Sequence, residues 1–222
     1  MSSSLGGYQY KGKTYSFDDI YNAIAYAETG IYSNPYRRTA VASSYINPNT
    51  GKMTGGSTAY GPVQLTSGSD SMIQNILSGG APKLFSQFSP DEVDYMKLMV
   101  EQGEKFLQFG NLDPSKRPAD YDPIYEYSPG TIDSSNIHQG TGTLGDDPNE
   151  RALYDSVAKK IMQYELDRIG NVGDFIDDWR GIVDQKYVDK IDKNIKSTYK
   201  KPTADNRLFD HMVKTTEGIN LG

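Results

Sequence analysis

Three long segments of this chain each begin with a helix-capping residue and end at a glycine, and this pattern constrains the fold most. The capping residues and the glycines that follow them are Ser16 and Gly30, Ser89 and Gly110, and Asp147 and Gly170. Serine and aspartate side chains accept hydrogen bonds from the first N–H groups of a helix, and glycine adopts the left-handed backbone that ends one. The pattern predicts a mainly α-helical protein.

Apolar residues recur every three or four positions within these segments, as they do on the buried face of a helix. In the longest segment they are Leu153, Val157, Ile161, Tyr164 and Ile169. Shorter helices are expected from Ser69 or Asp70 to Gly79, around Phe175 and Trp179, and over roughly residues 184–199. The sequence therefore predicts several helices that share one core.

Two short stretches favour β structure instead. Tyr8 and Tyr10 alternate ahead of a Lys-Gly-Lys turn, which predicts a hairpin. Residues 39–46 are rich in β-branched and small residues, and residues 47–51 (NPNTG) have turn composition, so a second small hairpin is expected there.

The domain organisation predicted from these elements is simple. We expect one domain over residues 1–200 and a loosely packed tail over residues 201–222. Residues 111–146 are rich in Pro, Gly, Asp, Ser and Tyr without a regular period, which predicts a long loop. A loop of that length inside a domain is often functional.

Composition excludes several classes of function. The 222 residues include 29 acidic and 23 basic ones, for a net charge of -6, and no basic stripe is present, so nucleic acid is not an expected partner. The absence of cysteine excludes a disulfide framework, a thiol nucleophile and a cysteine-bound metal. No apolar run approaches the roughly 20 residues of a membrane span. The first residues lack the basic and apolar regions of an export signal.

Two glycine-rich stretches match nucleotide-binding motifs without the context that such motifs need. Residues 7–14 (GYQYKGKT) fit the phosphate-binding loop, but the six residues before them form no buried strand. Residues 140–145 (GTGTLG) fit the dinucleotide fingerprint, again without a preceding strand. We interpret the first as a hairpin and the second as a loop, and we expect no metal site and no cofactor.

Glu28 is the strongest candidate for a catalytic residue. It follows Ile24 by four positions, so a carboxyl group lies on the apolar stripe of the first helix. Burial favours the protonated form of a carboxyl group, which is what a general acid requires. The alternative is a structural ion pair with Arg37 or Arg38, and the helix pattern alone does not choose between the two.

Two stretches in order resemble a known family. Residues 27–30 (AETG) are followed, after the predicted β region, by residues 56–66 (GSTAYGPVQLT). Together they resemble the lysozyme-like superfamily, especially lytic transglycosylases and phage lysins. The resemblance covers about residues 16–66, and it implies an α+β lysozyme-like fold: a helical domain with a small β hairpin flanking a glycan cleft.

The resemblance also implies roles for individual residues. Glu28 takes the place of the catalytic acid, Ser57 that of a loop serine, Gly61 that of a glycine beside the sugar, and Gln64 that of a glutamine facing the cleft. The implied substrate is the glycan of the bacterial cell wall, cut at the β-1,4 bond between N-acetylmuramic acid and N-acetylglucosamine.

Three tyrosines are additional candidates for substrate binding. Tyr60 lies inside the matched stretch, Tyr127 lies in the long loop, and Tyr187 follows Trp179 in a segment that is a candidate wall of the cleft. For Trp179 the alternative is a core anchor between helices. The Ala-Tyr-Asn motif of many bacterial lytic transglycosylases is absent, so no tyrosine is assigned by motif.

The reaction and its setting leave alternatives open. Residues 31–66 contain no Asp or Glu, which favours a single-carboxylate route that ends in a 1,6-anhydro sugar. An acid from the long loop, such as Asp120, Asp122, Glu126 or Asp133, would instead support hydrolysis. A non-catalytic glycan-binding or virion structural protein on the same fold is the third possibility. The resemblance implies a phage lysin held in the host cytoplasm before release to the cell wall, or a virion-associated enzyme.

Overall fold

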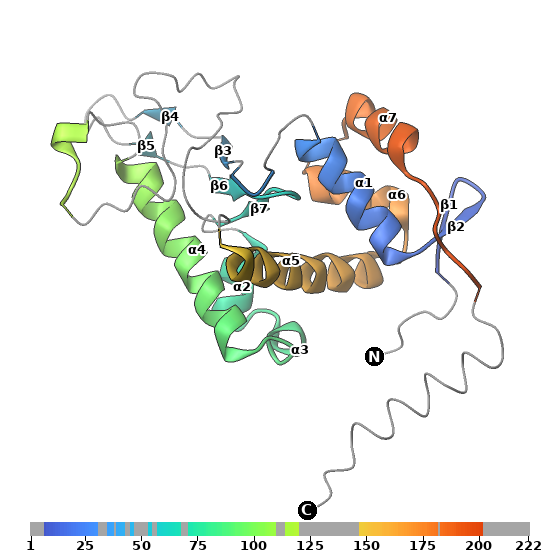
Figure 1. Cartoon of the computed structure of the whole chain (residues 1–222), viewed down its shortest axis with the longest axis horizontal. Helices are drawn as coiled ribbons and strands as arrows, with labels where there is room; N and C mark the ends of the chain where they lie inside the picture. Colours follow the sequence, from blue (N-terminus) through green and yellow to red (C-terminus); the bar gives the residue numbers. More distant parts are fainter. Residues whose placement is uncertain are drawn as a thin grey trace, which may run out of the picture. The chain divides into compact units, whose positions relative to one another are not determined.

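The computed structural model describes residues 7–30, 35–37, 39–42, 45–46, 53–54, 57–67, 71–109, 114–119, 147–181 and 183–201. The chain divides into two compact units (Figure 1). The terminal unit combines Met1–Ala23 with Ile169–Gly222, and the central unit is Ile24–Arg168. The predicted fold class, mainly helical with a small antiparallel hairpin, is confirmed. The expectation of one domain over residues 1–200 stays a prediction.

The terminal unit begins with the predicted hairpin. Strand β1 (Tyr8–Tyr10) pairs antiparallel with β2 (Lys13–Tyr15), with Tyr8 opposite Tyr15. Lys11 and Gly12 make the turn with positive φ angles of 47° and 75°. The stretch that matches a phosphate-binding loop is therefore a β hairpin, not a strand followed by a helix.

Helix α1 (Phe17–Thr29) follows the hairpin and starts where its capping residues predict. The backbone N–H of Ser16 donates to Asp19 Oδ2 at 2.7 Å, and the N–H of Asp19 donates to Ser16 Oγ at 3.1 Å. This reciprocal pair satisfies two donors at the helix N-terminus. Ile20 and Ile24 are buried, as the apolar stripe predicts.

Two further helices complete the terminal unit. Asn171 caps α6 (Val172–Arg180) by accepting from a backbone N–H of its first turn, and Gly181 ends it in the left-handed conformation at φ 75°. Asp184 caps α7 (Gln185–Asn194) in the same way as Asn171. Both helices were expected from the sequence.

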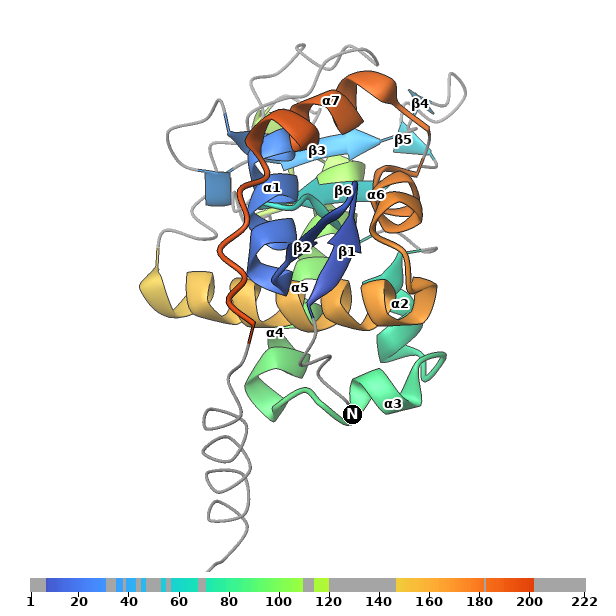
Figure 2. The same ribbon diagram turned by 90° about the vertical axis from the view of Figure 1, so that its right-hand side faces the viewer.

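The predicted end of the last helix near residue 199 is wrong. Helix α7 ends at Asn194, and residues 195–201 form no regular helix or strand. Asp19 Oδ1 accepts the backbone N–H of Thr198 at 2.9 Å and its hydroxyl at 2.5 Å. This segment therefore runs beside α1 (Figure 2), because a partner far away in the sequence binds it there.

The central unit contains most of the helical residues. Its helices are α2 (Met72–Leu77), α3 (Pro82–Phe85), α4 (Pro90–Phe109) and α5 (Pro148–Ile169), with short 3-10 turns η1 (Pro35–Arg37) and η2 (Pro114–Lys116). The cap of α2 is Ser71, whose Oγ accepts from the N–H of Gln74 at 3.2 Å, and not Ser69 or Asp70. Helix α3, which starts at a proline, was not expected.

The β region of the central unit is larger than the predicted hairpin. Strands β3 (Thr39–Ala42), β6 (Ser57–Tyr60) and β7 (Leu65–Thr66) form an antiparallel sheet in the order β3-β6-β7, and β4 (Tyr45–Ile46) pairs with β5 (Met53–Thr54). Tyr60 lies opposite both Thr39 and Leu65. Strand β6 is therefore the middle strand, and it leads directly into residues 61–64.

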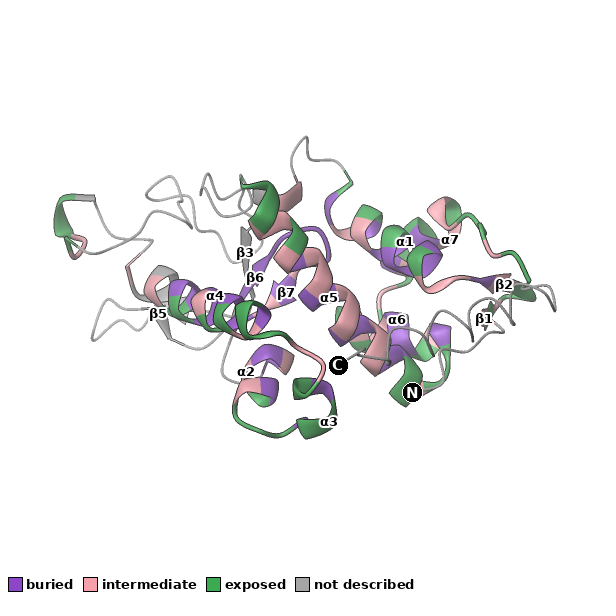
Figure 3. Ribbon diagram, turned by 60° about the horizontal axis from the view of Figure 1, so that its bottom comes forward, coloured by how far each residue is buried: buried purple, intermediate pink, exposed green. Residues whose placement is uncertain are grey.

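Helix α5 buries only part of the predicted stripe, of which Val157 and Ile161 are buried as expected. Leu153, Tyr164 and Ile169 are only half-buried. The buried residues of this helix are Tyr154, Val157, Ala158, Ile161, Met162, Glu165 and Leu166. Figure 3 shows buried residues along both α4 and α5. The core face is thus rotated toward Tyr154, because its hydroxyl finds partners inside the unit.

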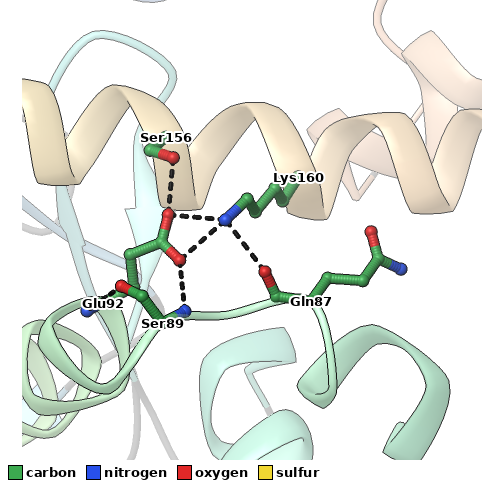
Figure 4. Close-up of polar contacts among 5 residues, drawn as sticks. All are labelled: Gln87, Ser89, Glu92, Ser156 and Lys160. Carbon is green, nitrogen blue, oxygen red and sulfur yellow. Dashed lines mark hydrogen bonds and ion pairs between the residues drawn. The ribbon is translucent and has the colours of Figure 1, made fainter. Parts of the chain in front are cut away.

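A capping box at the start of α4 is tied to α5 (Figure 4). Ser89 caps the helix as predicted, and it and Glu92 form reciprocal hydrogen bonds of 2.7 and 3.2 Å. From α5, Lys160 Nζ donates to both oxygens of Glu92 at 2.7 Å and to the carbonyl oxygen of Gln87 at 2.9 Å, while Ser156 donates at 2.5 Å. Burial alone raises the pKa of Glu92, but these donors outweigh it and hold the pKa below its usual value.

Some predicted segments lie outside the described residues. These are the 47–51 turn, the tail from residue 202 onward, and most of the long loop, of which only residues 114–119 are described.

Candidate functional site

Glu28 is the penultimate residue of α1, and its side chain is half-buried. The next residue, Thr29, is 2% exposed. Its hydroxyl is 2.9 Å from the carbonyl oxygen of Ala25 and 3.0 Å from that of Pro62, and it donates to both. The end of the helix that carries Glu28 is therefore fastened to a turn that lies 33 positions later in the chain.

That turn spans residues 61–64 and contains Gln64. The carbonyl oxygen of Gly61 accepts the backbone N–H of Gln64 at 3.1 Å and its side-chain Nε2 at 2.8 Å. Gly61 and Gln64 both have positive φ angles, of 76° and 55°. Such a backbone is rare for a residue with a side chain, and strained positions of this kind gather at functional sites.

Tyr154 of α5 holds the same turn from inside the central unit. Its hydroxyl donates to the carbonyl oxygen of Tyr60 at 2.7 Å and accepts the N–H of Val63 at 3.3 Å. The tyrosine is 0% exposed, and its ring meets that of Tyr60 edge-on at 5.6 Å. The turn is thus bound on one side by α1 and on another by α5.

The structure explains why position 61 is a glycine, and the explanation is one that the sequence did not suggest. A Cβ atom at this position would lie 2.4 Å from the Tyr154 ring, well inside van der Waals contact. The space beside Gly61 is filled by that ring, so core packing requires the glycine. Contact between Gly61 and a sugar stays a prediction.

The prediction of substrate contact by Tyr60 does not fit the place of its ring. The residue is 1% exposed, and its side chain packs in the core against Tyr154. Burial of Tyr60 follows from the place of β6 as the middle strand of its sheet, where Thr58 and Ala59 are buried as well. What Tyr60 contributes to the turn is its backbone carbonyl oxygen.

The other predicted binding residues are not brought to this turn by the described contacts. The backbone of Ser57 pairs with Ala42 at the start of β6, and its side chain lies outside the described residues, as does all of Tyr127. Tyr187 belongs to the terminal unit, where it is buried and the Arg180 guanidinium lies 5.3 Å from its ring centre. Their roles in binding stay predictions.

A further group of residues lies next to Tyr154. Tyr36 of η1 donates its hydroxyl to Asp155 Oδ2 at 2.6 Å, and its ring meets the Tyr154 ring edge-on at 5.9 Å. The Arg151 guanidinium lies 5.3 Å from the Tyr36 ring centre. Burial, and then the hydrogen bond to the negative Asp155, raise the pKa of the Tyr36 hydroxyl, and the charge of Arg151 opposes them. Tyr36 therefore stays neutral at ordinary pH.

The predicted alternative for Glu28, an ion pair with Arg37 or Arg38, stays open. The Arg37 side chain and the whole of Arg38 lie outside the described residues. Glu28 itself is neither fully exposed nor fully enclosed.

Sequence reasoning missed four residues of this site: Thr29, Tyr36, Tyr154 and Asp155. A local signal existed for Thr29, because a threonine hydroxyl at a helix end commonly donates to the carbonyl four residues earlier. No local signal marks Tyr154, whose partners lie 91 and 94 positions away.

Metal ligands, membrane-spanning helices and similar proteins were also sought. Within the described ranges, no group of three or more His, Cys, Asp or Glu side chains is placed to hold a metal ion. None of the helices described is both long and apolar enough to cross a membrane. Comparisons with protein-family models, curated proteins and solved structures find no match for this chain.

Proposed function

We propose that this chain is a peptidoglycan-degrading enzyme in which Glu28 donates a proton to the glycosidic oxygen between N-acetylmuramic acid and N-acetylglucosamine. The observation that carries the proposal is the hydrogen bond from Thr29 to Pro62, which joins the two stretches of sequence that resemble the lysozyme-like superfamily. The proposed chemistry requires the acid and the glutamine to be neighbours, and this bond holds the helix end of Glu28 against the turn of Gln64.

The setting of Glu28 suits a proton donor. Its side chain is half-buried, and it lies in the last turn of α1, where the partial negative charge of the helix end disfavours a second negative charge. We propose that these two features keep Glu28 protonated before a glycan binds. Partial exposure leaves the group within reach of a bound glycan.

The proposed reaction uses Glu28 twice. As the bond between the muramyl C1 and the leaving oxygen breaks, Glu28 gives its proton to that oxygen, and positive charge develops on the sugar. The Glu28 carboxylate then takes the proton of the muramyl 6-hydroxyl, whose oxygen bonds to C1 and closes a 1,6-anhydro ring. Gln64 and Ser57 are proposed to hold the sugar by hydrogen bonds.

The absence of acidic residues from positions 31–66 supports this single-carboxylate route over hydrolysis. We place the enzyme as a phage lysin or a virion-associated lytic transglycosylase, which acts on the bacterial cell wall.

The test is digestion of purified peptidoglycan, followed by mass spectrometry of the released fragments. The wild-type protein should release muropeptides with 1,6-anhydro ends. Glu28→Gln should lower the rate about 10²–10⁴-fold, the usual contribution of a general acid. Glu104→Gln, an exposed change on α4, is the matched control and should keep the wild-type rate.

Three results would contradict parts of the proposal. Full activity of Glu28→Gln, with a circular dichroism melt like that of the wild type, would remove the catalytic assignment. Reducing ends without anhydro ends would show hydrolysis and a second carboxylate. Glycan binding without any cleavage would show a binding protein instead of an enzyme.

A further inference from the structure

We propose that Tyr154 is a positioning residue for this site: its hydroxyl fixes the shape of the 61–64 turn, and through that turn it sets the position of Gln64. The effect of Tyr154 on catalysis rests on the function proposed above. Its effect on the shape of the turn rests on the contacts alone. No motif assigned this tyrosine, and it acts through backbone groups instead of touching the reacting atoms.

The hydroxyl of Tyr154 bridges the two ends of the turn. Its single proton goes to the carbonyl oxygen of Tyr60, the residue before Gly61, at 2.7 Å. Its oxygen accepts the N–H of Val63, the residue before Gln64, at 3.3 Å. One oxygen atom therefore links the backbone of Tyr60 to that of Val63, and it belongs to a residue that is 0% exposed. Because the site is buried, water does not readily replace the hydroxyl.

The ring of Tyr154 is locked in place as firmly as its hydroxyl. It meets the rings of Tyr60 and Tyr36 edge-on at 5.6 and 5.9 Å. The third contact is with Gly61, where even a methyl group would meet the ring at 2.4 Å. A ring held on three sides presents its hydroxyl in one place, which is what a positioning group requires.

The turn passes this constraint to Gln64. Gln64 has a φ of 55°, a strained value that persists only where surrounding contacts hold it. Its side-chain Nε2 and its own N–H both donate to Gly61, between the two atoms that Tyr154 binds. Removing the hydroxyl of Tyr154 should therefore make the backbone of the 61–64 turn more mobile. The Gln64 side chain should then lose its fixed orientation.

The first experiment measures amide hydrogen exchange over residues 59–67 in Tyr154→Phe, which removes only the hydroxyl. The Val63 amide should exchange at least tenfold faster than in the wild type. The matched control is Tyr164→Phe, the same change at a half-buried position on the same helix, which should leave the turn unchanged. Unchanged exchange at Val63 in Tyr154→Phe would overturn the proposal, and this measurement needs no enzymatic activity.

The second experiment asks whether the effect reaches Gln64, using kcat/KM on purified peptidoglycan. Tyr154→Phe should lower kcat/KM about tenfold, and Tyr164→Phe should not. In a Gln64→Ala background, Tyr154→Phe should cost almost nothing further, because the group that it positions is already gone. Fully additive losses would show that Tyr154 acts only on stability and would overturn the proposal.

The two experiments separate this inference from the proposed function. A wild-type protein that cleaves no peptidoglycan refutes the function, and the exchange measurement then decides alone whether Tyr154 fixes the turn. If the wild type is active and the losses of kcat/KM in Tyr154→Phe and Gln64→Ala are additive, the proposed function stands and the positioning role is refuted.

Discussion

The hydroxyl of Thr29 donates a hydrogen bond of 3.0 Å to the carbonyl oxygen of Pro62. Thr29 is the last residue of α1, and Pro62 lies in the turn that ends with Gln64. The same hydroxyl also reaches the carbonyl oxygen of Ala25 within the helix. A single buried side chain thus joins the helix end beside Glu28 to the rest of the candidate site.

We expect Thr29→Val to weaken both the fold and the site. Valine has nearly the shape of threonine but no hydroxyl, so the Pro62 carbonyl loses this buried donor, at a cost of about 2 kcal/mol. Lysis of peptidoglycan should fall with it, because Glu28 and Gln64 are no longer held together. Denaturant unfolding and muropeptide release measure the two effects. Thr66→Val, at a half-buried position on β7, should change neither.

Gly61→Ala should be far more damaging than Gly12→Ala. Both glycines have φ angles near the left-handed region, 76° and 75°, so each alanine costs about 1 kcal/mol of backbone strain. Only at Gly61 does the new methyl group also collide with a core ring, that of Tyr154, which should bring the total to about 3 kcal/mol. Gly12 has no such neighbour within 4 Å. Equal losses of unfolding free energy would contradict the packing argument.

Glu92→Gln should destabilise the contact between α4 and α5 by about 2 kcal/mol. Gln lacks the charge that Lys160 neutralises, and the buried carboxylate is where the hydrogen bonds of Lys160, Ser156 and Ser89 converge. Glu101→Gln is the control, because Glu101 pairs with Lys105 on the exposed side of α4, where ion pairs contribute little. Thermal unfolding of the two variants should differ by several degrees, and similar melts would refute the role of the cluster.

The stability that Glu92 confers should depend on pH. Its pKa in the folded protein lies below the ordinary value of 4.5, so its contribution is complete above pH 4.5 and is lost as the pH falls through the lower, folded value. The difference in unfolding free energy between the wild type and Glu92→Gln should therefore shrink as the pH falls below 4.5. A difference that stays constant over this range would show that the carboxylate charge is not what stabilises the cluster.

Asp19→Asn should release residues 195–201 from α1. Burial raises the pKa of Asp19, but hydrogen bonds from Thr198 and Ser16 outweigh it and lower the pKa, so the group acts as a charged acceptor. Asparagine keeps the shape and weakens these bonds, and amide exchange at Thr198 should increase. Asp18→Asn removes the same charge from an exposed position of the same helical turn, so Thr198 should stay protected in that variant.

Signals carried by adjacent residues predicted much of the fold. The capping boxes at Ser16 and Ser89, the start of α5 after Asp147, and the hairpin of Tyr8 and Tyr10 each depend on partners within a few positions. Such partners are visible in a short window of sequence, so the local pattern and the structure agree there.

The features that the sequence did not predict depend on contacts between residues that are far apart in the chain. Helix α7 ends five positions early because Asp19 binds Thr198, 179 residues away. The buried face of α5 includes Tyr154 because its hydroxyl is satisfied by residues 91 and 94 positions earlier. Of the candidate site, the helix pattern pointed to Glu28 and the resemblance added Gln64, whereas neither assigned a role to Thr29 or Tyr154.

The terminal unit joins two segments that are far apart in the sequence, so it can complete its folding only after the second segment has been synthesised. Tyr10 donates to Asp192 at 3.0 Å, and Asp19 accepts from Thr198, so these residues bind partners 182 and 179 positions later in the chain. The central unit is one continuous stretch and has all its residues by position 168. During translation the hairpin and the start of α1 must wait for these partners, while the stretch that holds Glu28, Gln64 and Tyr154 is already out of the tunnel.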